Sequence, residues 1–376
     1  MLRRSRSRFA VVAVSITAAG VMLTACGNSA QNAGATGGAT DDQVKAQATS
    51  LLKKADTRPT TIGITEPVGA PIPAGKTVAF MTCSLSSCTE ISTIAEDAAK
   101  VLGWKLVKIN IGATPETVKA GYAQAVQMHP DAVMGTGYGP ELFGPELDQL
   151  SAMKIPVLLA SVAMKSPKVT ATFLDSAYNK DAGALQADWT LAKYGNDSHA
   201  LAIDVPDLTT VHAWFEGFTA EYKRLCPGCE LGQVSLATSD LGTPKVSSQV
   251  TAYIQSHPKA NAIQMATSNI ALGLPPALST LNYKGSIGVL NADDAVRQYM
   301  RKGQVSVSNG SDWPTTVWTM FDTVARVYTN KPIGPDLSAP QSHWLYGPDN
   351  IPEGTGYRTP LVKDYQEQFK KLWNVS

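Results

Sequence analysis

Residues 114–130, TPETVKAGYAQAVQMHP, have a counterpart at residues 243–258, TPKVSSQVTAYIQSHP. This repeated segment predicts the architecture of the protein. Each segment opens with a threonine and a proline, residues that suit the N-cap and the first position of a helix. Each has a His-Pro pair at its end, and the helix is expected to stop there because proline cannot continue a helix. A short apolar run follows both, AVM at 132–134 and AIQM at 262–265. The repeat predicts two similar halves in which an amphipathic helix precedes a buried strand.

Strand and helix patterns alternate on both sides of these segments. In the first half the pattern predicts strands at residues 77–81, 106–109, 132–135 and 156–160, with helices at 91–102, from 114 and from 140. In the second half it predicts strands at residues 200–204, 231–236, 262–266 and 286–290, with helices at 211–225, from 243 and near 269–282. Uninterrupted apolar strands are typical of parallel sheets covered on both faces. We therefore expect an α/β fold with two similar lobes, each a parallel sheet flanked by helices, and a ligand cleft at the carboxyl ends of the strands.

The composition limits the classes of function. The chain has 376 residues, enough for two domains, and its 32 basic and 31 acidic residues give a net charge of +1. A nucleic-acid-binding protein would carry a basic excess, so we expect no nucleic-acid partner. The apolar fraction of 44% is ordinary and excludes a polytopic membrane protein.

The N-terminus has the pattern of an export signal. Four arginines within residues 1–8 precede an apolar stretch at 9–22, which is too short to span a membrane. The sequence Leu23-Thr24-Ala25-Cys26 follows and resembles the lipobox of bacterial lipoproteins. The resemblance implies a signal peptide at residues 1–25 and lipidation of Cys26. The composition of residues 27–50, mostly Ala, Gly, Asn, Gln, Ser and Thr, predicts a flexible tether, which we place at 26–60. The protein would then be extracytoplasmic, anchored to the outer face of the cell membrane. An ordinary secretory signal is the alternative.

The four remaining cysteines occur as two close pairs. In an exported chain this pattern favours two local disulfides, Cys83–Cys88 and Cys226–Cys229. The Cys-Pro-Gly-Cys run could also be a redox motif, although it follows a predicted helix, whereas redox cysteines usually begin one. A four-cysteine zinc site is a third possibility.

The order of elements resembles the type I periplasmic-binding family, in particular its ribose-binding branch. The resemblance rests on short sequence segments: KTVAFM at 76–81, AAKVLGW at 98–104, IPV at 155–157, EGF at 216–218, ALG at 271–273, and Asn291 after IGVL at 287–290. The resemblance implies an ABC-transporter solute-binding protein whose lobes close around one small molecule for delivery to a membrane permease. It implies a first lobe of residues 76–165 plus 293–308, a second of 170–290 plus 309–330, and a C-terminal tail, 331–376, wrapping back across both. The hinge crossovers are expected near 166–173, 291–293 and 306–312.

The family holds its ligand with loops at strand ends. In the first lobe this points to Thr82, Ser84, Ser86, Thr136, Tyr138 and Ser161. In the second lobe it points to Asp204, Asp207, Trp214, Thr267, Ser268, Asn269, Asn291, Asn309 and Asp312.

The sequence departs from the ribose-binding pattern where that branch has charged residues. Ser161 and Trp214 stand where the branch has arginines, and Asn291 where it has an aspartate. Hydroxyl and amide groups suit a small neutral ligand, because they bind it without burying charge. We therefore expect a sugar, a polyol or a related molecule, with Tyr138 and Trp214 stacking on its apolar face.

No catalytic pattern stands out in the sequence. His212 with Asp204 or Asp207 could join a serine, but proximity along the chain is weak support for a triad. Residues 135–139, GTGYG, do not satisfy a phosphate-binding motif. Asp293 and Asp294 are better explained as a helix start than as a cation site. We expect that the protein is not an enzyme and that it binds no cofactor and no metal. The alternatives are an extracellular ligand sensor, or a hydrolase or redox protein with a related α/β fold.

Overall fold

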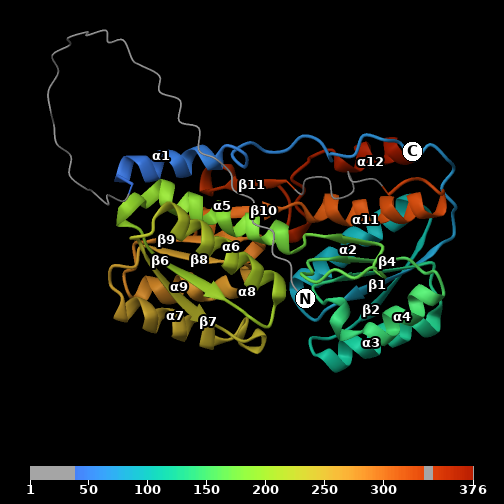
Figure 1. The fold of residues 1–376 in the computed structure, drawn as a ribbon, viewed down its shortest axis with the longest axis horizontal. Helices are drawn as coiled ribbons and strands as arrows, with labels where there is room; N and C mark the ends of the chain where they lie inside the picture. The colour runs from blue at the N-terminus through green and yellow to red at the C-terminus, as the bar shows by residue number, and fades with distance from the viewer. Residues whose placement is uncertain (1–38, 334–341, 376) are drawn as a thin grey trace, which may run out of the picture. The chain divides into compact units, whose positions relative to one another are not determined.

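The computed structural model describes residues 39–333 and 342–375, which form two lobes built on two sheets (Figure 1). The first sheet has the order β2-β1-β3-β4-β5, all parallel: β1 (Thr77–Thr82), β2 (Lys105–Asn110), β3 (Ala132–Thr136), β4 (Val157–Ala160) and β5 (Ala171–Phe173). The second has the order β11-β10-β9-β8-β6-β7: β6 (His199–Asp204), β7 (Glu230–Ser235), β8 (Ala262–Met265), β9 (Ser286–Leu290), β10 (Val307–Ser311) and β11 (His343–Tyr346). Of these six strands, β11 runs antiparallel to its neighbour. The predicted α/β fold of two lobes is confirmed.

Alternating side chains of β1 divide the first lobe into two hydrophobic layers. Val78 and Phe80 pack on one side, and Ala79 and Met81 on the other, because successive strand residues face opposite ways. The first side is covered by α2 (Ser86–Val101), α11 (Trp313–Tyr328) and α12 (Tyr365–Trp373). The second side is covered by α3 (Pro115–Met128) and α4 (Gly144–Ala152), which follows the short 3-10 turn η1 (Pro140–Leu142).

The second lobe has a single continuous core. Its helices are α1 (Asp41–Leu52), α5 (Ser176–Tyr194), α6 (Thr209–Leu225), α7 (Pro244–Ser256), α8 (Ser268–Ala271), α9 (Leu274–Thr280) and α10 (Asp294–Arg301). The predicted helix near 269–282 is divided into α8 and α9, because Gly273 between them is left-handed at φ 73°. Helices α5 and α6 cross closely at Gly183, where a Cβ atom would lie 2.1 Å from the carbonyl oxygen of Trp214.

The two repeated segments fold as predicted. Thr114 caps α3 by accepting a hydrogen bond from the backbone of Thr117, and Thr243 caps α7 in the same manner at Lys245. Both helices have proline in the first turn, and each is followed by a fully buried strand, β3 or β8.

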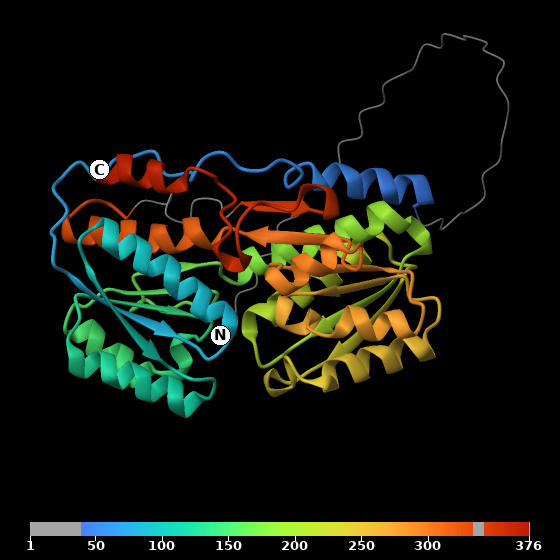
Figure 2. The ribbon, with the colours of Figure 1, turned by 180° about the vertical axis from the view of Figure 1, so that it is seen from behind.

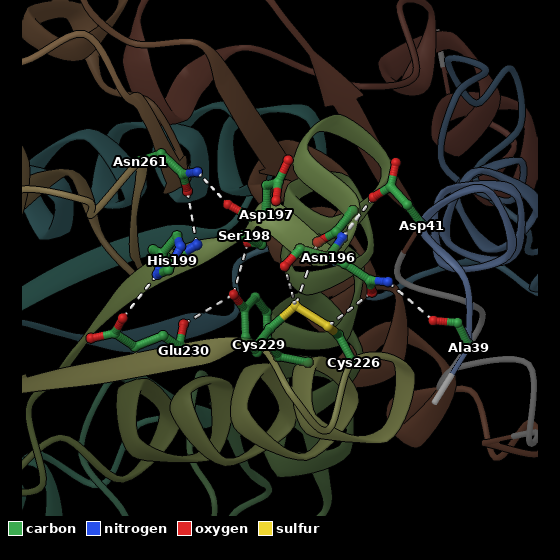
Figure 3. The surroundings of a disulfide bond; sticks show 12 residues. Ala39, Asp41, Asn196, Asp197, Ser198, His199, Cys226, Cys229, Glu230 and Asn261 are labelled. Carbon is green, nitrogen blue, oxygen red and sulfur yellow. Dashed lines mark hydrogen bonds and ion pairs between the residues drawn. A yellow bond between two sulfur atoms is a disulfide. The ribbon is translucent and has the colours of Figure 1, made fainter. Parts of the chain in front are cut away.

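The segment predicted as a tether is partly helical. Helix α1 occupies residues 41–52 and packs against α5, with Val44 and Ala48 buried. Figure 3 shows its polar attachment: Asp41 accepts a hydrogen bond from the backbone of Asn196 (2.8 Å), whose side chain donates to Ala39 (3.0 Å). The tether prediction is therefore wrong for these residues; so few apolar positions give no helix signal without α5. The predicted signal peptide, Cys26 and the start of the tether lie outside the described residues.

Two chain segments belong to different lobes from those predicted. Residues 293–308, expected in the first lobe, place Val296, Met300 and Val305 in the core of the second. Helix α11, expected in the second, packs its apolar face in the first. The chain crosses between lobes between α1 and β1, after β5, near Asp312, and again before and after β11. Residues 291–293, in contrast, join β9 to α10 within one lobe. Apolar periodicity shows that a helix covers a sheet but does not show which sheet.

The C-terminal segment contributes to both lobes: β11 extends the second sheet, and α12 packs against α11 (Figure 2). Both predicted disulfides are present: Cys83–Cys88 joins the loop after β1 to the first turn of α2, and Cys226–Cys229 follows α6. Because all four of these cysteines are paired in disulfides, they do not form the four-cysteine zinc site that was the third possibility. None of the helices in the described parts of the chain is long and apolar enough to cross a membrane.

Candidate functional site

A cavity of about 130 Å³ lies between the lobes at the carboxyl ends of strands from both sheets. The first lobe lines it with Cys83, Leu85, Ser87, Cys88, Ile91, Thr136, Gly137, Tyr138 and Ser161. The second lobe lines it with Asn179, Leu208, Thr210, Val211, Ala266, Thr267, Asn269, Leu290 and Asn291. Trp313 and Tyr357 complete the wall. Larger hollows of about 230 and 530 Å³ are lined by the second lobe alone, at the amino ends of its strands. The interlobe cavity is where α/β sheets place ligands.

Several predicted residues meet at this cavity: Thr136, Tyr138, Ser161, Thr267, Asn269 and Asn291. Ser161 and Asn291 end their strands in left-handed conformations, with φ of 56° and 60°. The Ser161 hydroxyl lies 3.4 Å from that of Thr210, so the lobes touch beside the cavity. The side-chain oxygen of Asn291 accepts a hydrogen bond from the backbone of Ser311 (2.7 Å), which fixes the loop after β9.

Trp214 does not reach the cavity. Its side chain is fully buried, its Nε1 donates a hydrogen bond to Gln186 Oε1 (2.8 Å), and its ring lies against Phe218. Helix α6 begins at Thr209, so Thr210 and Val211 in its first turn line the cavity, while Trp214 lies a turn further along. The predicted stacking role is wrong because the phase of the helix turns this residue into the core.

The predicted aspartates are also occupied elsewhere. Both oxygens of Asp204 lie 3.1 Å from His212 Nδ1, and Asp207 accepts a hydrogen bond from the backbone of Thr238 (3.3 Å). Asp312 caps α11, accepting from Thr315 N (3.1 Å), and its burial raises the pKa of the carboxyl group. None of the three lines the cavity.

Four further candidates lie off the cavity wall: Thr82, Ser84, Ser268 and Asn309. The Thr82 hydroxyl donates to the Cys88 carbonyl (3.3 Å), and Ser84 faces solvent. Ser268 and Asn309 are fully buried. For Ser86 the structure describes the backbone, as the first residue of α2, and not the side chain.

The cavity wall is electrically neutral. Hydroxyl and amide side chains alternate with Leu85, Ile91, Leu208, Val211 and Leu290, and no described residue of the lining is acidic or basic. Burial raises the pKa of Tyr138, so its phenol stays neutral. A charged ligand would lose its hydration here without gaining an opposite charge from the wall.

Two polar atoms of the wall are buried without a partner. Thr136 Oγ1 and Trp313 Nε1 have no hydrogen-bond partner within the described structure. Buried polar groups are nearly always paired, so unpaired ones need an explanation. At a cavity wall, a bound ligand or a water molecule can supply the missing partner.

Sequence reasoning missed Trp313 and Tyr357. Their ring centroids are 6.4 Å apart, at an interplanar angle of 58°. Trp313 follows the predicted Asp312 directly, and its place at the end of β10 was a usable signal. Tyr357 comes from the C-terminal segment, where no local pattern marks it.

The enzyme alternatives gain no support from this geometry. Apart from Asp204, the acidic group nearest to His212 is Glu216, with 4.0 Å between Nε2 and Oε1; no serine is among its described hydrogen-bond partners. Within the described residues, no three His, Cys, Asp or Glu side chains form a candidate metal site.

A family model described as periplasmic binding protein domain matches residues 79–332. The chain belongs to the periplasmic binding protein family. Its two lobes have the type I form of that fold. No curated protein matches its sequence.

Solved structures of the same fold are distant in sequence. An ABC sugar transporter subunit from Rhodobacter sphaeroides is 14% identical with a TM-score of 0.63, over 74% of this chain and 99% of that one. A 5-methylthioribose transporter solute-binding protein from Thermotoga lettingae, in complex with 5-methylthioribose, is 14% identical with a TM-score of 0.64, over 81% and 95%. An ABC transporter solute-binding protein from Agrobacterium vitis with bound allitol is 16% identical with a TM-score of 0.61, over 79% and 99%.

Proposed function

We propose that this periplasmic binding protein captures a small neutral ligand, of the sugar or polyol class, in the interlobe cavity and delivers it to an ABC permease. The observation that carries the proposal is the uncharged wall that contains two unpaired polar atoms, Thr136 Oγ1 and Trp313 Nε1. The similar structures support the ligand class, because they are a sugar transporter subunit and two solute-binding proteins, one in complex with 5-methylthioribose and one with bound allitol.

The chemistry of the wall suits a ligand that is polar at its edges and apolar on one face. Hydroxyl and amide groups offer both donors and acceptors to ligand hydroxyls. Trp313 and Tyr357 offer aromatic surface for the carbon skeleton. No turnover is needed for this role, and we propose that the protein is not an enzyme.

The site of action follows from the N-terminal sequence. We propose export by the signal peptide, lipidation of Cys26, and anchoring at the outer face of the cell membrane. Replacement of Cys26 by serine should then move the protein from the membrane fraction to the soluble fraction of cells. A protein that stays in the membrane fraction after this change would refute the anchor.

The ligand proposal is tested by thermal unfolding of the chain lacking residues 1–26 against sugars, polyols, amino acids and small aromatics. Binding to the folded state raises the melting temperature by mass action. A shift with a neutral sugar or polyol is expected, and isothermal titration would then give its affinity. Shifts confined to charged amino acids would overturn the neutral-ligand proposal.

A matched pair of variants tests the cavity itself. Thr136→Val removes an unpaired hydroxyl of the wall at constant shape, so affinity should fall by roughly 2-fold to 10-fold without loss of stability. Thr82→Val is the control, because Thr82 ends the neighbouring strand β1 with its hydroxyl bonded to Cys88. Equal affinities of Thr136→Val and wild type would exclude Thr136 from the site.

A further inference from the structure

The segment between β11 and α12, residues 347–361, passes between the two lobes; we refer to it as the strap. Figure 2 shows it between the second sheet and α2. On the second lobe it is held by Arg297 of α10, which is buried. The Arg297 guanidinium donates to the carbonyl oxygens of Pro352 (3.4 Å), Gly354 (3.0 Å) and Gly356 (3.2 Å).

Two consecutive peptide groups of the strap bind carboxylates from different lobes. The backbone N–H of Gly356 donates to Asp294 of α10, in the second lobe (2.7 Å). The next N–H, that of Tyr357, donates to Glu90 of α2, in the first lobe (2.7 Å). Separation of the lobes would pull Glu90 and Asp294 apart, so at least one of these charge-assisted hydrogen bonds has to break.

The backbone at this crossing is adapted to the close approach. Gly356 has a left-handed φ of 41°, and a Cβ atom there would lie 2.2 Å from Glu90 Oε2. A residue with a side chain would therefore displace the carboxylate that holds Tyr357. At the exposed rim, Arg358 adds an ion pair with Asp97 of α2 (3.2 Å).

The strap also brings Tyr357 to the cavity wall. Its hydroxyl lies 3.4 Å from Ser268 of the second lobe, and its ring faces Trp313. Burial raises the pKa of Tyr357 to about 12, so the phenol remains a neutral hydrogen-bonding group.

We propose that the strap is a latch that favours the closed arrangement of the lobes, and that Tyr357 is the ligand contact it carries into the cavity. The role of Tyr357 rests on the proposed function, whereas the latch is independent of any ligand. Closure of the lobes and completion of the cavity wall are thereby coupled, because Tyr357, whose backbone N–H binds Glu90, also carries the side chain that completes the wall.

The latch is tested without ligand by the distance between spin labels on the two lobes, in the chain lacking residues 1–26. Labels at Lys119→Cys on α3 and Ser248→Cys on α7 sit at exposed positions. Glu90→Ala or Asp294→Ala removes one acceptor, which should shift the ratio of closed to open molecules roughly 10-fold to 100-fold towards open. The label distances should lengthen or broaden accordingly.

The matched control is Glu96→Ala, because Glu96 is an exposed carboxylate of α2 that pairs with Lys108 away from the strap. Its distances should equal those of the parent. If Glu90→Ala does not fold, Glu90→Gln keeps an acceptor oxygen without the charge and should give a smaller shift. Unchanged distances in both the Glu90 and the Asp294 variants would overturn the latch.

Tyr357→Ala tests the ligand contact, using the neutral sugar or polyol that most stabilises the wild type. The affinity of the variant for this ligand should fall at least 10-fold, since the aromatic contact of the Tyr357 ring and its hydroxyl are both lost. Tyr357→Phe should fall less. An affinity of Tyr357→Ala equal to wild type would refute the contact alone. If the wild type binds none of the panel, the proposed function and the contact fail together, and the label distances still decide the latch.

Discussion

Replacement of Trp214 by phenylalanine should destabilise the second lobe while leaving the cavity intact. Trp214 Nε1 donates to Gln186 Oε1 (2.8 Å), and Gln186 Nε2 donates to Gln264 Oε1 (3.0 Å). Gln264 Nε2 then donates to Thr190 Oγ1 (3.0 Å). All four side chains are fully buried, so a broken link cannot be replaced by water from the surface.

The size of the effect follows from two contributions. Loss of the indole N–H leaves Gln186 Oε1 without its donor, which costs about 1–3 kcal/mol. The gap left when an indole becomes a phenyl ring, on the order of 40 Å³, adds about 1 kcal/mol. The free energy of unfolding should therefore fall by about 2–4 kcal/mol.

Urea unfolding followed by far-ultraviolet circular dichroism measures this change. Trp189→Phe is the control, because Trp189 lies on α5 with a half-exposed side chain under Lys193 and should cost far less. Gln186→Leu should also destabilise, and the double variant Trp214→Phe/Gln186→Leu should lose less than the sum, because both changes break the same link.

Two results would refute this reasoning. A loss of stability as small as that of Trp189→Phe would mean that the buried network does not stabilise the lobe. A loss of ligand affinity of tenfold or more at unchanged stability would return Trp214 to the binding site.

Two further predictions concern the disulfides and the buried histidine. Removal of either disulfide by a paired Cys→Ser change should lower the free energy of unfolding by about 2 kcal/mol, because the unfolded chain gains loop entropy. Only loss of Cys83–Cys88, which lines the cavity, should also weaken ligand binding in titration calorimetry. Equal weakening of binding by loss of Cys226–Cys229 would contradict this prediction. Burial, reinforced by the charge of Lys54 and opposed by that of Asp181, lowers the pKa of His343 from 6.5 to about 4. The folded state therefore disfavours the proton that the unfolded chain takes up, so stability should decline as the pH falls from 6.5 towards 4. His343→Phe, which can keep the ring stacking on Tyr178, should remove up to about 3 kcal/mol of this loss of stability, measured by urea unfolding at several pH values. If the variant loses as much stability as the wild type between pH 6.5 and 4, His343 is not the source of the loss.

Much of the site could be predicted because parallel strands deliver their carboxyl ends to one edge. Ser161 and Asn291 were expected at that edge from their position after apolar strands, and both line the cavity. The neutral character of the wall was likewise visible in the residue types. The rule fails for Trp214, since the loop before α6 is short and the helix phase decides which of its residues face the cavity.

Features that depend on neighbours along the chain could be predicted from the local sequence: the helices capped at Thr114 and Thr243, the apolar strands after them, and the pairing of cysteines three to five residues apart. Tertiary structure alone decided which sheet each later helix covers, as for α11, and whether a weakly apolar segment such as α1 folds at all. It also decided that the strap brings Tyr357 to the cavity. These outcomes depend on contacts between residues far apart in sequence, such as Glu90 with Tyr357, and such contacts leave no periodic signal in either partner.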